Sequence, residues 1–321
     1  MTSIDIFNGD ADGICALTQI RNANPTETRL VTGVKRDISL VAKAGIEAGD
    51  RVTVLDISLD KNRDGIVKAL AMGVEIFYAD HHDAGEIPDD PHLTALIDTA
   101  PDVCTSILVN RHLGGRFVEW AVVGAFGDNL KAPARALAEP LSLSEEQLDL
   151  LDRLGVCINY NAYGASLADL HFEPEALFRL VSRYASPFEF VHDSRGAFEK
   201  LENGYFEDIS KARELRPSSE TDDTAVLLLP NEAWARRSSG VFSNELANAS
   251  PCRAHAVITE RDDGSYLVSV RAPLEKKTGA SELCSRFPTG GGREAAAGIN
   301  NLPADQLDAF ISEFTAFYER A

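Results

Sequence analysis

Two adjacent histidines flanked by carboxylates form the most distinctive short stretch of this sequence. Asp80, His81, His82 and Asp83 directly follow the apolar run GVEIFYA, which has the composition of a buried strand. A solvent-exposed run of charges has no need of two imidazoles, and a core strand seldom ends in this way. Imidazole and carboxylate groups together are ligands for divalent metals, and histidine also exchanges protons near neutral pH.

A second group of carboxylates lies near the amino terminus, in the stretch FNGDADGICA. Asp10 and Asp12 are two residues apart, with Asn8 before them and Gly13 after them. Carboxylates held close together repel each other unless a cation neutralises them. An Asp-rich turn would explain this stretch equally well if it stood alone.

Two more segments place an aspartate after an apolar run. Asp56 follows VTVL, and Asp128 follows AVVGAFG. The carboxyl ends of parallel strands meet at one edge of a sheet, where α/β proteins bind their ligands. We therefore expect the aspartates and His81 to converge on a site for two metal ions, with Mn²⁺ favoured and Mg²⁺ as the alternative.

The elements that must position these residues alternate between short apolar runs and helical patterns, which predicts an α/β fold with a doubly wound, mainly parallel sheet. We expect strands over 4–7, 30–33, 51–55, 74–78 and 95–97, and helices over 13–22, 61–72 and 103–113. A more helical region follows. One helix begins at either of two capping boxes, Ser142 with Glu145 or Ser144 with Gln147, and another begins at Pro174.

The chain is predicted to contain two domains, 1–196 and 224–321. The charged segment 197–223, which includes RPSSETDD, is interpreted as a linker. In the second, smaller α/β domain, AVLLL, AHAVI and YLVSV predict strands, with RDDG as a hairpin turn. The stretch TGGGREAAAGI is predicted to be a glycine-rich loop that leads into a helix.

Taken in order, NGDADG, VLDIS, DHH and FGD resemble the successive motifs of the DHH phosphoesterase superfamily. The later VSVRAP and TGGGREAAAG resemble the DHH-associated C-terminal domain of its RecJ-like and oligoribonuclease-like branch. The resemblance spans both domains and implies a metal-dependent phosphoesterase with its active-site cleft between them. The glycine motif argues against the pyrophosphatase branch, which carries a different anion-binding signature.

The resemblance also implies roles for the metal-type residues. Asp10 and Asp56 would hold one metal ion. Asp12, Asp56, His81 and Asp128 would hold the other, with Asp56 as the bridging ligand. An activated water would attack the phosphorus, and no side-chain nucleophile is expected.

Residues around this set have supporting roles by the same resemblance. His82 would contact the substrate phosphate or donate a proton to it, while Asp80 and Asp83 would orient other groups. Two positions depart from the family pattern. Asn8 stands where most relatives have a histidine ligand, and Arg293 stands where the glycine motif usually has a histidine.

The second domain is expected to bind the rest of the substrate. Gly290, Gly291 and Gly292 would offer backbone N–H groups to an anion, helped by the N-terminus of the predicted helix. Arg271 and Arg293 would supply positive charge, and arginine presents a fixed fork of donors to phosphate.

Two other stretches carry weaker signals. Lys35, Arg36 and Asp37 are interpreted as a solvent-exposed loop in preference to a phosphate contact. The stretch INYNAYGASLADLHF is compatible with a nucleobase-facing surface and with a packed polar turn; its polar and aromatic residues are Asn159, Tyr160, Asn161, Tyr163 and His171.

Composition limits the partners. The net charge of −19 argues against a long duplex nucleic acid. Residues 1–20 lack a basic n-region, no apolar run approaches the length of a membrane span, and the five cysteines lack secreted-type spacing. We expect a cytoplasmic protein that does not contact membranes; the sequence leaves a homodimer open.

The function predicted from these observations is Mn²⁺-dependent hydrolysis of phosphodiester bonds in short oligonucleotides or dinucleotides. Two alternatives stay open. One is a phosphomonoesterase acting on a bisphosphorylated nucleotide. The other is a nucleotide-binding regulatory module that has lost turnover, an interpretation that the changes at Asn8 and Arg293 motivate.

Overall fold

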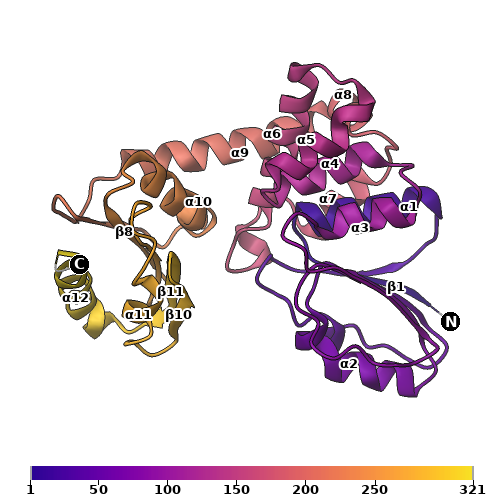
Figure 1. Cartoon of the computed structure of the whole chain (residues 1–321), viewed down its shortest axis with the longest axis horizontal. Helices are drawn as coiled ribbons and strands as arrows, with labels where there is room; N and C mark the ends of the chain where they lie inside the picture. Colours follow the sequence, from indigo (N-terminus) through magenta and orange to yellow (C-terminus); the bar gives the residue numbers. More distant parts are fainter. Residues whose placement is uncertain (1, 320–321) are drawn as a thin grey trace. The chain divides into compact units, whose positions relative to one another are not determined.

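The structure is a computed structural model that describes residues 2–319, and the chain divides into two compact units at Gly204 and Tyr205 (Figure 1). Unit 1, up to Gly204, contains a five-stranded sheet in the order β2-β1-β3-β4-β5, and every neighbouring pair is parallel. This confirms the α/β class with a parallel sheet. The strands are β1 Ser3–Phe7, β2 Arg29–Val31, β3 Arg51–Leu55, β4 Glu75–Asp80 and β5 Leu93–Ile97.

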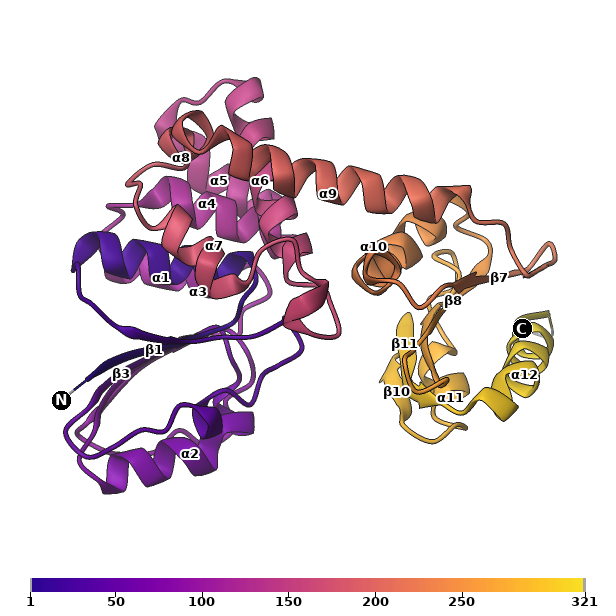
Figure 2. The same ribbon diagram turned by 180° about the vertical axis from the view of Figure 1, so that it is seen from behind.

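Helices cover both faces of the unit 1 sheet, as a doubly wound fold requires (Figures 1 and 2). Helices α1 (Ala11–Ala23) and α3 (Thr105–His112) lie on one face, and α2 (Leu59–Ala71) lies on the other. On the α2 side, alternate strand residues such as Val54 and Tyr78 are completely buried in the core. The period-2 alternation of the strands therefore decides which residues face α2.

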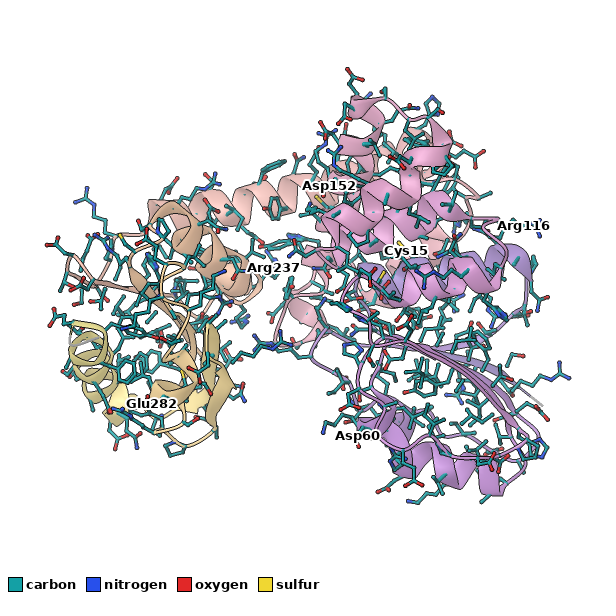
Figure 3. The ribbon with its side chains drawn as sticks, in the orientation of Figure 1. Cys15, Asp60, Arg116, Asp152, Arg237 and Glu282 are labelled. Carbon is teal, nitrogen blue, oxygen red and sulfur yellow. The ribbon has the colours of Figure 1, made fainter. Side chains whose placement is uncertain are left out.

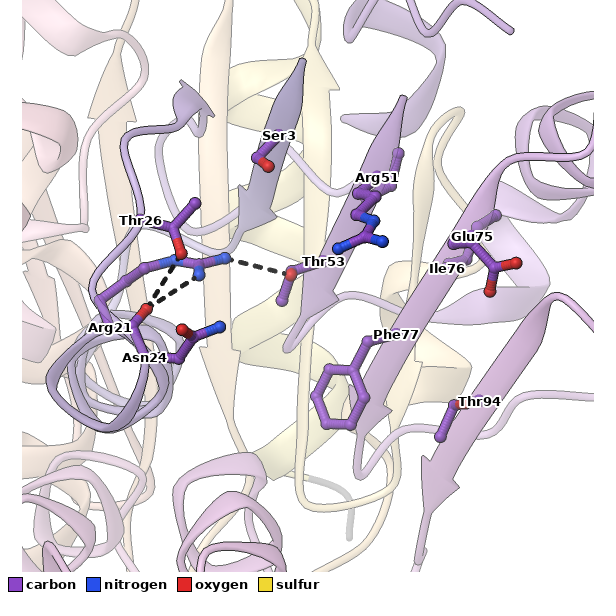
Figure 4. A pocket seen from close by; sticks show the side chains of 11 residues that line it. Ser3, Arg21, Asn24, Thr26, Arg51, Thr53, Glu75, Ile76, Phe77 and Thr94 are labelled. Atoms are coloured by element: carbon purple, nitrogen blue, oxygen red, sulfur yellow. Dashed lines mark hydrogen bonds between the residues drawn. The ribbon is translucent and has the colours of Figure 1, made fainter. Parts of the chain in front are cut away.

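The opposite face of β1 buries an ion pair. Nε and Nη2 of Arg21, from α1, lie 2.8 and 2.5 Å from the two carboxylate oxygens of Asp5. Thr28 donates a further hydrogen bond to Asp5 at 2.7 Å. Arg21 also donates to Thr53 at the wall of a pocket that opens beside the amino ends of the strands (Figure 4). This pocket lies at the edge of the sheet opposite to the strand ends that precede Asp10, Asp56 and His81.

The helical layer of unit 1 continues with α4 Val118–Gly127, α5 Lys131–Ala138, α6 Glu145–Asn161, α7 Pro174–Val181 and α8 Pro187–Asp193, and with the short 3₁₀ helices η1 Val41–Lys43, η2 Glu139–Leu141 and η3 Leu167–Asp169. The capping box that forms is Ser144 with Gln147. Ser142 instead has a φ of 53°, so it ends the preceding turn. The predicted start of a helix at Pro174 is confirmed.

The predicted linker is not an irregular segment. Residues Arg195–Glu214 form helix α9, and β6 (Ser219–Glu220) pairs with the strand that follows it, β7 (Thr224–Leu229). Phe198, Leu201 and Ile209 are buried at helical spacing, a pattern that the many charged residues between them obscure. The carboxylate of Asp208 on α9 forms a buried ion pair with Arg237 at 2.7 Å; Arg237 is labelled in Figure 3.

Unit 2, from Tyr205 on, contains a six-stranded mixed sheet in the order β10-β11-β9-β8-β7-β6. Helix α10 packs on one face through Phe242, and α11 and α12 pack on the other through residues such as Phe310 and Phe314. The remaining elements are β7 Thr224–Leu229, α10 Ala233–Ala249, β8 Ala254–Glu260, β9 Tyr266–Arg271, α11 Ala280–Cys284, β10 Gly290–Arg293, β11 Ala296–Leu302, η4 Ala304–Gln306 and α12 Leu307–Glu319.

The glycine-rich stretch does not lead into a helix. It forms a tight antiparallel hairpin, in which Gly292 pairs with Ala297 and Arg293 with Ala296. A Cβ on Gly290 would lie 1.8 Å from the carbonyl oxygen of Cys284, and one on Gly292, whose φ is 147°, would lie 2.5 Å from Ala297. The glycines therefore permit a closely packed edge hairpin, and the proposed helix N-terminus beside them does not exist.

Among residues 2–319, none of the helices combines the length and the apolarity needed to cross a bilayer.

Helices α4 and α6 cross at a distance that only glycine permits. A Cβ on Gly155 would lie 2.3 Å from the carbonyl oxygen of Val123 and 2.8 Å from the backbone nitrogen of Gly127. We expect Gly155→Ala to lower the free energy of unfolding by about 2–4 kcal/mol through forced separation of the helices. Gly196→Ala is the control, because a Cβ there meets nothing within 4 Å. Equal unfolding midpoints in urea for both variants would contradict this account of the crossing.

Candidate metal centre

Asp10 is the N-cap of α1. Its Oδ1 accepts hydrogen bonds from the backbone nitrogens of Asp12 and Gly13, both at 3.1 Å. The N-cap role explains why an aspartate followed by Gly13 begins a helix at the end of β1. Burial acts to raise the pKa of Asp10, but Lys35, a hydrogen bond with Asp56 and the hydrogen bond from Gly13 hold it below its ordinary value.

Asp12 is oriented by a different helix. Its two carboxylate oxygens accept hydrogen bonds from the backbone nitrogens of Thr105 and Ser106, each at 2.7 Å. These N–H groups belong to the first turn of α3, where they have no partner within the helix. The amino end of α3 therefore fixes both oxygens of a carboxylate that is almost fully buried.

Asp56 follows β3 with an unusual backbone conformation. Its φ is 59°, in the left-handed region that non-glycine residues seldom adopt. The backbone nitrogen donates to Ala79 on the neighbouring strand at 3.1 Å, and the carboxylate accepts from the Thr105 hydroxyl at 3.2 Å. Burial, and then the charges of Asp10 and Asp12, raise the pKa of Asp56 well above its ordinary value. Backbone strain at this position is consistent with a functional role.

His81 presents one ring nitrogen to three carboxylates. Its Nδ1–H donates to the carbonyl oxygen of Val103 at 3.1 Å, which leaves Nε2 with a lone pair. Nε2 lies 3.5 Å from Asp56 Oδ1, 3.7 Å from Asp128 Oδ2 and 4.0 Å from Asp12 Oδ2. A carbonyl that fixes the tautomer in this way is the usual support of a metal-binding histidine.

Asp128 completes this group from the C-cap of α4. It keeps 21% of its side chain exposed. Burial, followed by the charges of Asp12 and Asp10, raises its pKa to about 6. A carboxyl group that resists ionisation beside two other carboxylates indicates a site with an excess of negative charge.

The predicted ligands are therefore brought together at one edge of the sheet. Asp12, His81 and Asp128 place ligand atoms close enough to hold one ion, and so do Asp56, His81 and His82. Oxygen donors with one or two neutral imidazoles fit Mn²⁺ or Mg²⁺ better than metals that prefer thiolates. The donor set thus fits the group that the sequence predicts, while its roles as ligands stay a prediction.

His82 lies beside this group but has a different setting. Its side chain is 47% exposed, and Nδ1 donates to Asp80 Oδ1 at 2.8 Å. The hydrogen bond to Asp80 raises the pKa of His82 against the opposing effect of burial. Asp80 is completely buried at the end of β4. Asp83 instead bonds the backbone nitrogen of Gly85 and takes no part in either group.

Asn8 is buried and precedes Asp10 by two residues, but it belongs to neither candidate group. Its Nδ2 makes a long contact of 3.5 Å with the carbonyl oxygen of Lys35. Its Oδ1 is buried and, among the described residues, has no hydrogen-bond partner. An unsatisfied buried oxygen is costly in a folded protein, and its role as a ligand stays a prediction.

Lys35 is the main residue that the sequence interpretation missed. Its Nζ lies 2.5 Å from Asp10 Oδ2, 3.0 Å from Asn159 Oδ1 and 3.9 Å from Asp128 Oδ1. The prediction of a solvated loop is wrong for this residue, although Asp37 does pair with Lys43 in an exposed ion pair. Lys35 comes shortly after β2. Residues that follow parallel strands meet at one edge of the sheet, and this argument, which was applied to the aspartates, also predicts that Lys35 lies near them.

The predicted anion-binding residues lie in unit 2. Arg293 pairs with Ala296, and Ala296 pairs with Arg271, so the two arginines share one cross-strand row of the sheet. Arg271 Nε donates to Asn244 on α10 at 2.7 Å. A Cβ on Gly291, on the same strand as Arg293, would meet nothing within 4 Å. Two arginines therefore flank a strip of small residues.

Comparison with solved structures identifies the fold. A crystal structure of exonuclease RecJ bound to manganese matches with a TM-score of 0.67 at 18% identity, covering 100% of this chain and 91% of that one. RecJ in complex with Mn²⁺ from Thermus thermophilus matches at 0.67 and 20% identity, but only 52% of that chain is covered. PggH from Vibrio cholerae, a pGpG-specific phosphodiesterase, matches at 0.57 and 13% identity, covering 100% and 99% of the two chains.

This chain therefore has the same fold as RecJ and PggH, which is the fold that the resemblance of its sequence motifs implied. No protein-family model matches the sequence, and no curated protein matches it either.

The raised pKa of Asp128 gives a pH-dependent prediction. Its folded-state value of about 6 lies above the ordinary value of 3.8, so the folded state binds this proton more tightly than the unfolded chain does. The Asp128 contribution to stability is therefore present below pH 4 and is lost as pH rises from about 4 to about 6. We expect Asp128→Asn, in EDTA, to be more stable than wild type by about 1–2 kcal/mol at pH 7.5 and by little at pH 4.5.

Urea unfolding at the two pH values measures this difference. Asp64→Asn is the control, because Asp64 is exposed on α2. A gain of the same size at both pH values, or in the control, would show that charge crowding at Asp128 is not the cause. Added Mn²⁺ should then raise the unfolding midpoint of wild type more than that of Asp128→Asn.

Proposed function

We propose that this chain is a divalent-cation-dependent phosphodiesterase that hydrolyses short nucleotides. The observation that carries the proposal is the convergence of three buried or half-buried carboxylates, from Asp12, Asp56 and Asp128, on Nε2 of His81. Three such charges are mutually repulsive without a cation. Carboxylates with one imidazole are also the donor set of phosphoester-cleaving metal sites.

The predicted ion assignments follow from the same residues. Asp12, Asp56, His81 and Asp128 would hold one ion, and Asp10 with Asp56 would hold a second, with Mn²⁺ favoured over Mg²⁺. A bound ion supplies charge stabilisation at a phosphoryl oxygen and lowers the pKa of a bound water to near neutrality. Val103, Thr105 and Ser106 would keep the ligand atoms oriented before any ion arrives.

His82 is proposed to act on the phosphate. Its half-exposed ring is accessible to a substrate, and Asp80 holds Nδ1–H by a 2.8 Å hydrogen bond. The hydrogen bond to Asp80 raises the pKa of His82, which increases the share of the protonated ring at any given pH. Nε2–H can then donate to a phosphate oxygen or pass its proton to a leaving alkoxide.

The arginine row of unit 2 is proposed to hold the remainder of the substrate. Arg271 and Arg293 stand on either side of Ala296 in one cross-strand row of three strands. β10, which contains Gly290 to Gly292, is an edge strand, so one side of its backbone faces no neighbouring strand. This arrangement supports recognition of a terminal phosphate and a flat nucleobase rather than of the backbone of a long nucleic acid.

Substrate length is proposed from two further facts. The net charge of −19 opposes a long nucleic acid, whose binding normally requires a basic surface. PggH, described as pGpG-specific, matches this chain over 99% of its own length, so a dinucleotide phosphodiesterase exists with this fold and extent. A linear dinucleotide with a 5′ phosphate is therefore the first substrate to test, followed by oligonucleotides and bisphosphorylated nucleotides.

A binding module without turnover is the competing candidate. It is favoured by Asn8 and Arg293, which depart from the family pattern near the expected chemistry. Tight nucleotide binding with no product at saturating Mn²⁺ would support it. The intact set of Asp12, Asp56, His81 and Asp128 favours the enzyme.

Asp56→Asn tests the metal cluster with little change in shape. We expect hydrolysis of a 5′-phosphorylated dinucleotide to fall by about a thousandfold, because a ligand shared by both predicted ions is lost. Product formation with added Mn²⁺ is measured by chromatography. Asp98→Asn is the matched control, since Asp98 follows β5 at the same edge of the sheet but belongs to neither group. Full activity of Asp56→Asn, or turnover in EDTA, would refute the proposal.

Arg293→Gln tests the anion role of unit 2. We expect KM for the dinucleotide to rise by about 10–100-fold with a smaller change in kcat, because a charge-assisted contact to phosphate is removed. Arg261→Gln is the control: Arg261 bonds the carbonyl oxygen of Asn300 elsewhere in unit 2. An unchanged KM for Arg293→Gln would remove Arg293 from the binding surface.

A further inference from the structure

A lysine ammonium already lies against one of the predicted metal ligands. Lys35 Nζ is 2.5 Å from Asp10 Oδ2 and 3.9 Å from Asp128 Oδ1. It thus stands among the carboxylates that the sequence assigned to metal ions. Only 26% of the Lys35 side chain is exposed, so the ion pair is shielded from screening by salt.

Both oxygens of Asp10 are engaged by the protein itself. Oδ1 accepts from the backbone nitrogens of Asp12 and Gly13, and Oδ2 accepts from Lys35. Asp10 accordingly belongs to neither group whose ligand atoms lie close enough together to hold an ion. Asp12, Asp56 and Asp128 differ from Asp10 in this respect, because no lysine lies within hydrogen-bond distance of their carboxylates in the described chain.

Lys35 is held in place by contacts other than Asp10. Its backbone nitrogen donates to the carbonyl oxygen of Ala162 at 3.0 Å, and Nζ donates to Asn159 Oδ1 at 3.0 Å. Nζ also lies 5.7 Å from the ring centre of Tyr163, within the range of a cation–π contact. The stretch at the end of α6, which the sequence left between two interpretations, therefore serves to position this lysine.

We propose that Lys35 is a built-in cation that competes with a second divalent ion for Asp10, so that the two ions bind stepwise. The first ion enters at Asp12, Asp56, His81 and Asp128, where no ammonium has to leave. The second reaches Asp10 only when Nζ gives up Oδ2. This inference rests on the proposed cation site, but it concerns the order and relative strength of binding and not hydrolysis.

The physical basis is simple electrostatics. An ammonium and a divalent ion that share one carboxylate lie only a few ångströms apart, and their repulsion must be overcome before both can remain. The Asn159 oxygen and the Tyr163 ring keep Nζ near the cluster when it leaves Asp10. The second ion therefore has to bind an oxygen that Nζ already contacts at 2.5 Å, whereas the nearest ligand atom of the first ion, Asp128 Oδ1, lies 3.9 Å from Nζ.

The test is Mn²⁺ binding to the full chain, followed by calorimetry and by electron paramagnetic resonance, without substrate. In wild type we expect the second ion to bind at least about tenfold more weakly than the first. Lys35→Met, which removes the charge, should tighten the second ion by about tenfold or more and change the first much less. The spin-coupled signal of two neighbouring Mn²⁺ ions should then appear at lower Mn²⁺ concentration.

Three further variants make the result specific. Lys35→Arg keeps the charge and should retain weak second-ion binding. Lys43→Met is the matched control, because Lys43 forms an exposed ion pair with Asp37 outside the cluster. Asn159→Ala keeps the lysine but removes one anchor, and it should shift the second affinity in the same direction by a smaller factor. Asn159→Ala also provides the test if Lys35→Met fails to fold.

The outcomes separate this inference from the function on which it rests. Equal affinities of wild type for two ions, or an unchanged second affinity in folded Lys35→Met, would overturn the role of Lys35 alone. An effect of Lys43→Met as large as that of Lys35→Met would do the same. Absence of any Mn²⁺ binding by wild type would overturn the cation site and this inference together.

Discussion

Repulsion among the carboxylates of Asp10, Asp12, Asp56 and Asp128 is the constraint on which the rest of unit 1 depends. The fold offsets it differently for each group. The amino end of α1 and Lys35 stabilise Asp10, and the amino end of α3 stabilises Asp12. The pKa values of Asp56 and Asp128 are raised, so these two carboxyl groups ionise less readily. Helix N-termini and a buried ammonium are the protein's own sources of positive charge. The cluster is therefore held together before any external cation contributes.

The parallel sheet makes this crowding unavoidable. β1, β3 and β4 are neighbours that run in the same direction, so whatever follows them is delivered to one edge. The carboxylates can approach one another only if the backbone adopts unusual conformations or close contacts nearby. Asp56 adopts a positive φ, and a Cβ at Gly13 would lie 2.2 Å from the carbonyl oxygen of Asn8. Glycine in the first turn of α1 thus lets the Asp10 segment fold back tightly over the strand end.

The sequence was sufficient where a residue's chemistry and its position after a strand coincide. The three central strands and the convergence of Asp12, Asp56, His81 and Asp128 follow from short-range patterns. Lys35 was misjudged because an ammonium in a loop is normally solvated, and only the carboxylate at the neighbouring strand end makes it buried. The N–H groups that orient Asp12 belong to residues whose side chains carry no such signal. The β10–β11 hairpin was mistaken for a loop before a helix, because glycine and alanine runs do not specify one local structure.

The buried ion pair between Asp5 and Arg21 influences the register of β1 against β3, and so the positions of the residues that follow these strands. Ile4 and Ile6 face the apolar core beneath the sheet, and Asp5 between them faces α1. A slip of β1 by one residue against β3 would turn Asp5 into that apolar core and leave Arg21 without its acceptor. The same slip would shift Asp10 and Asp12 by about 3.3 Å relative to Asp56. An ion pair far from the predicted ligands therefore helps to set the register of β1 against β3, and with it the distance of Asp10 and Asp12 from Asp56.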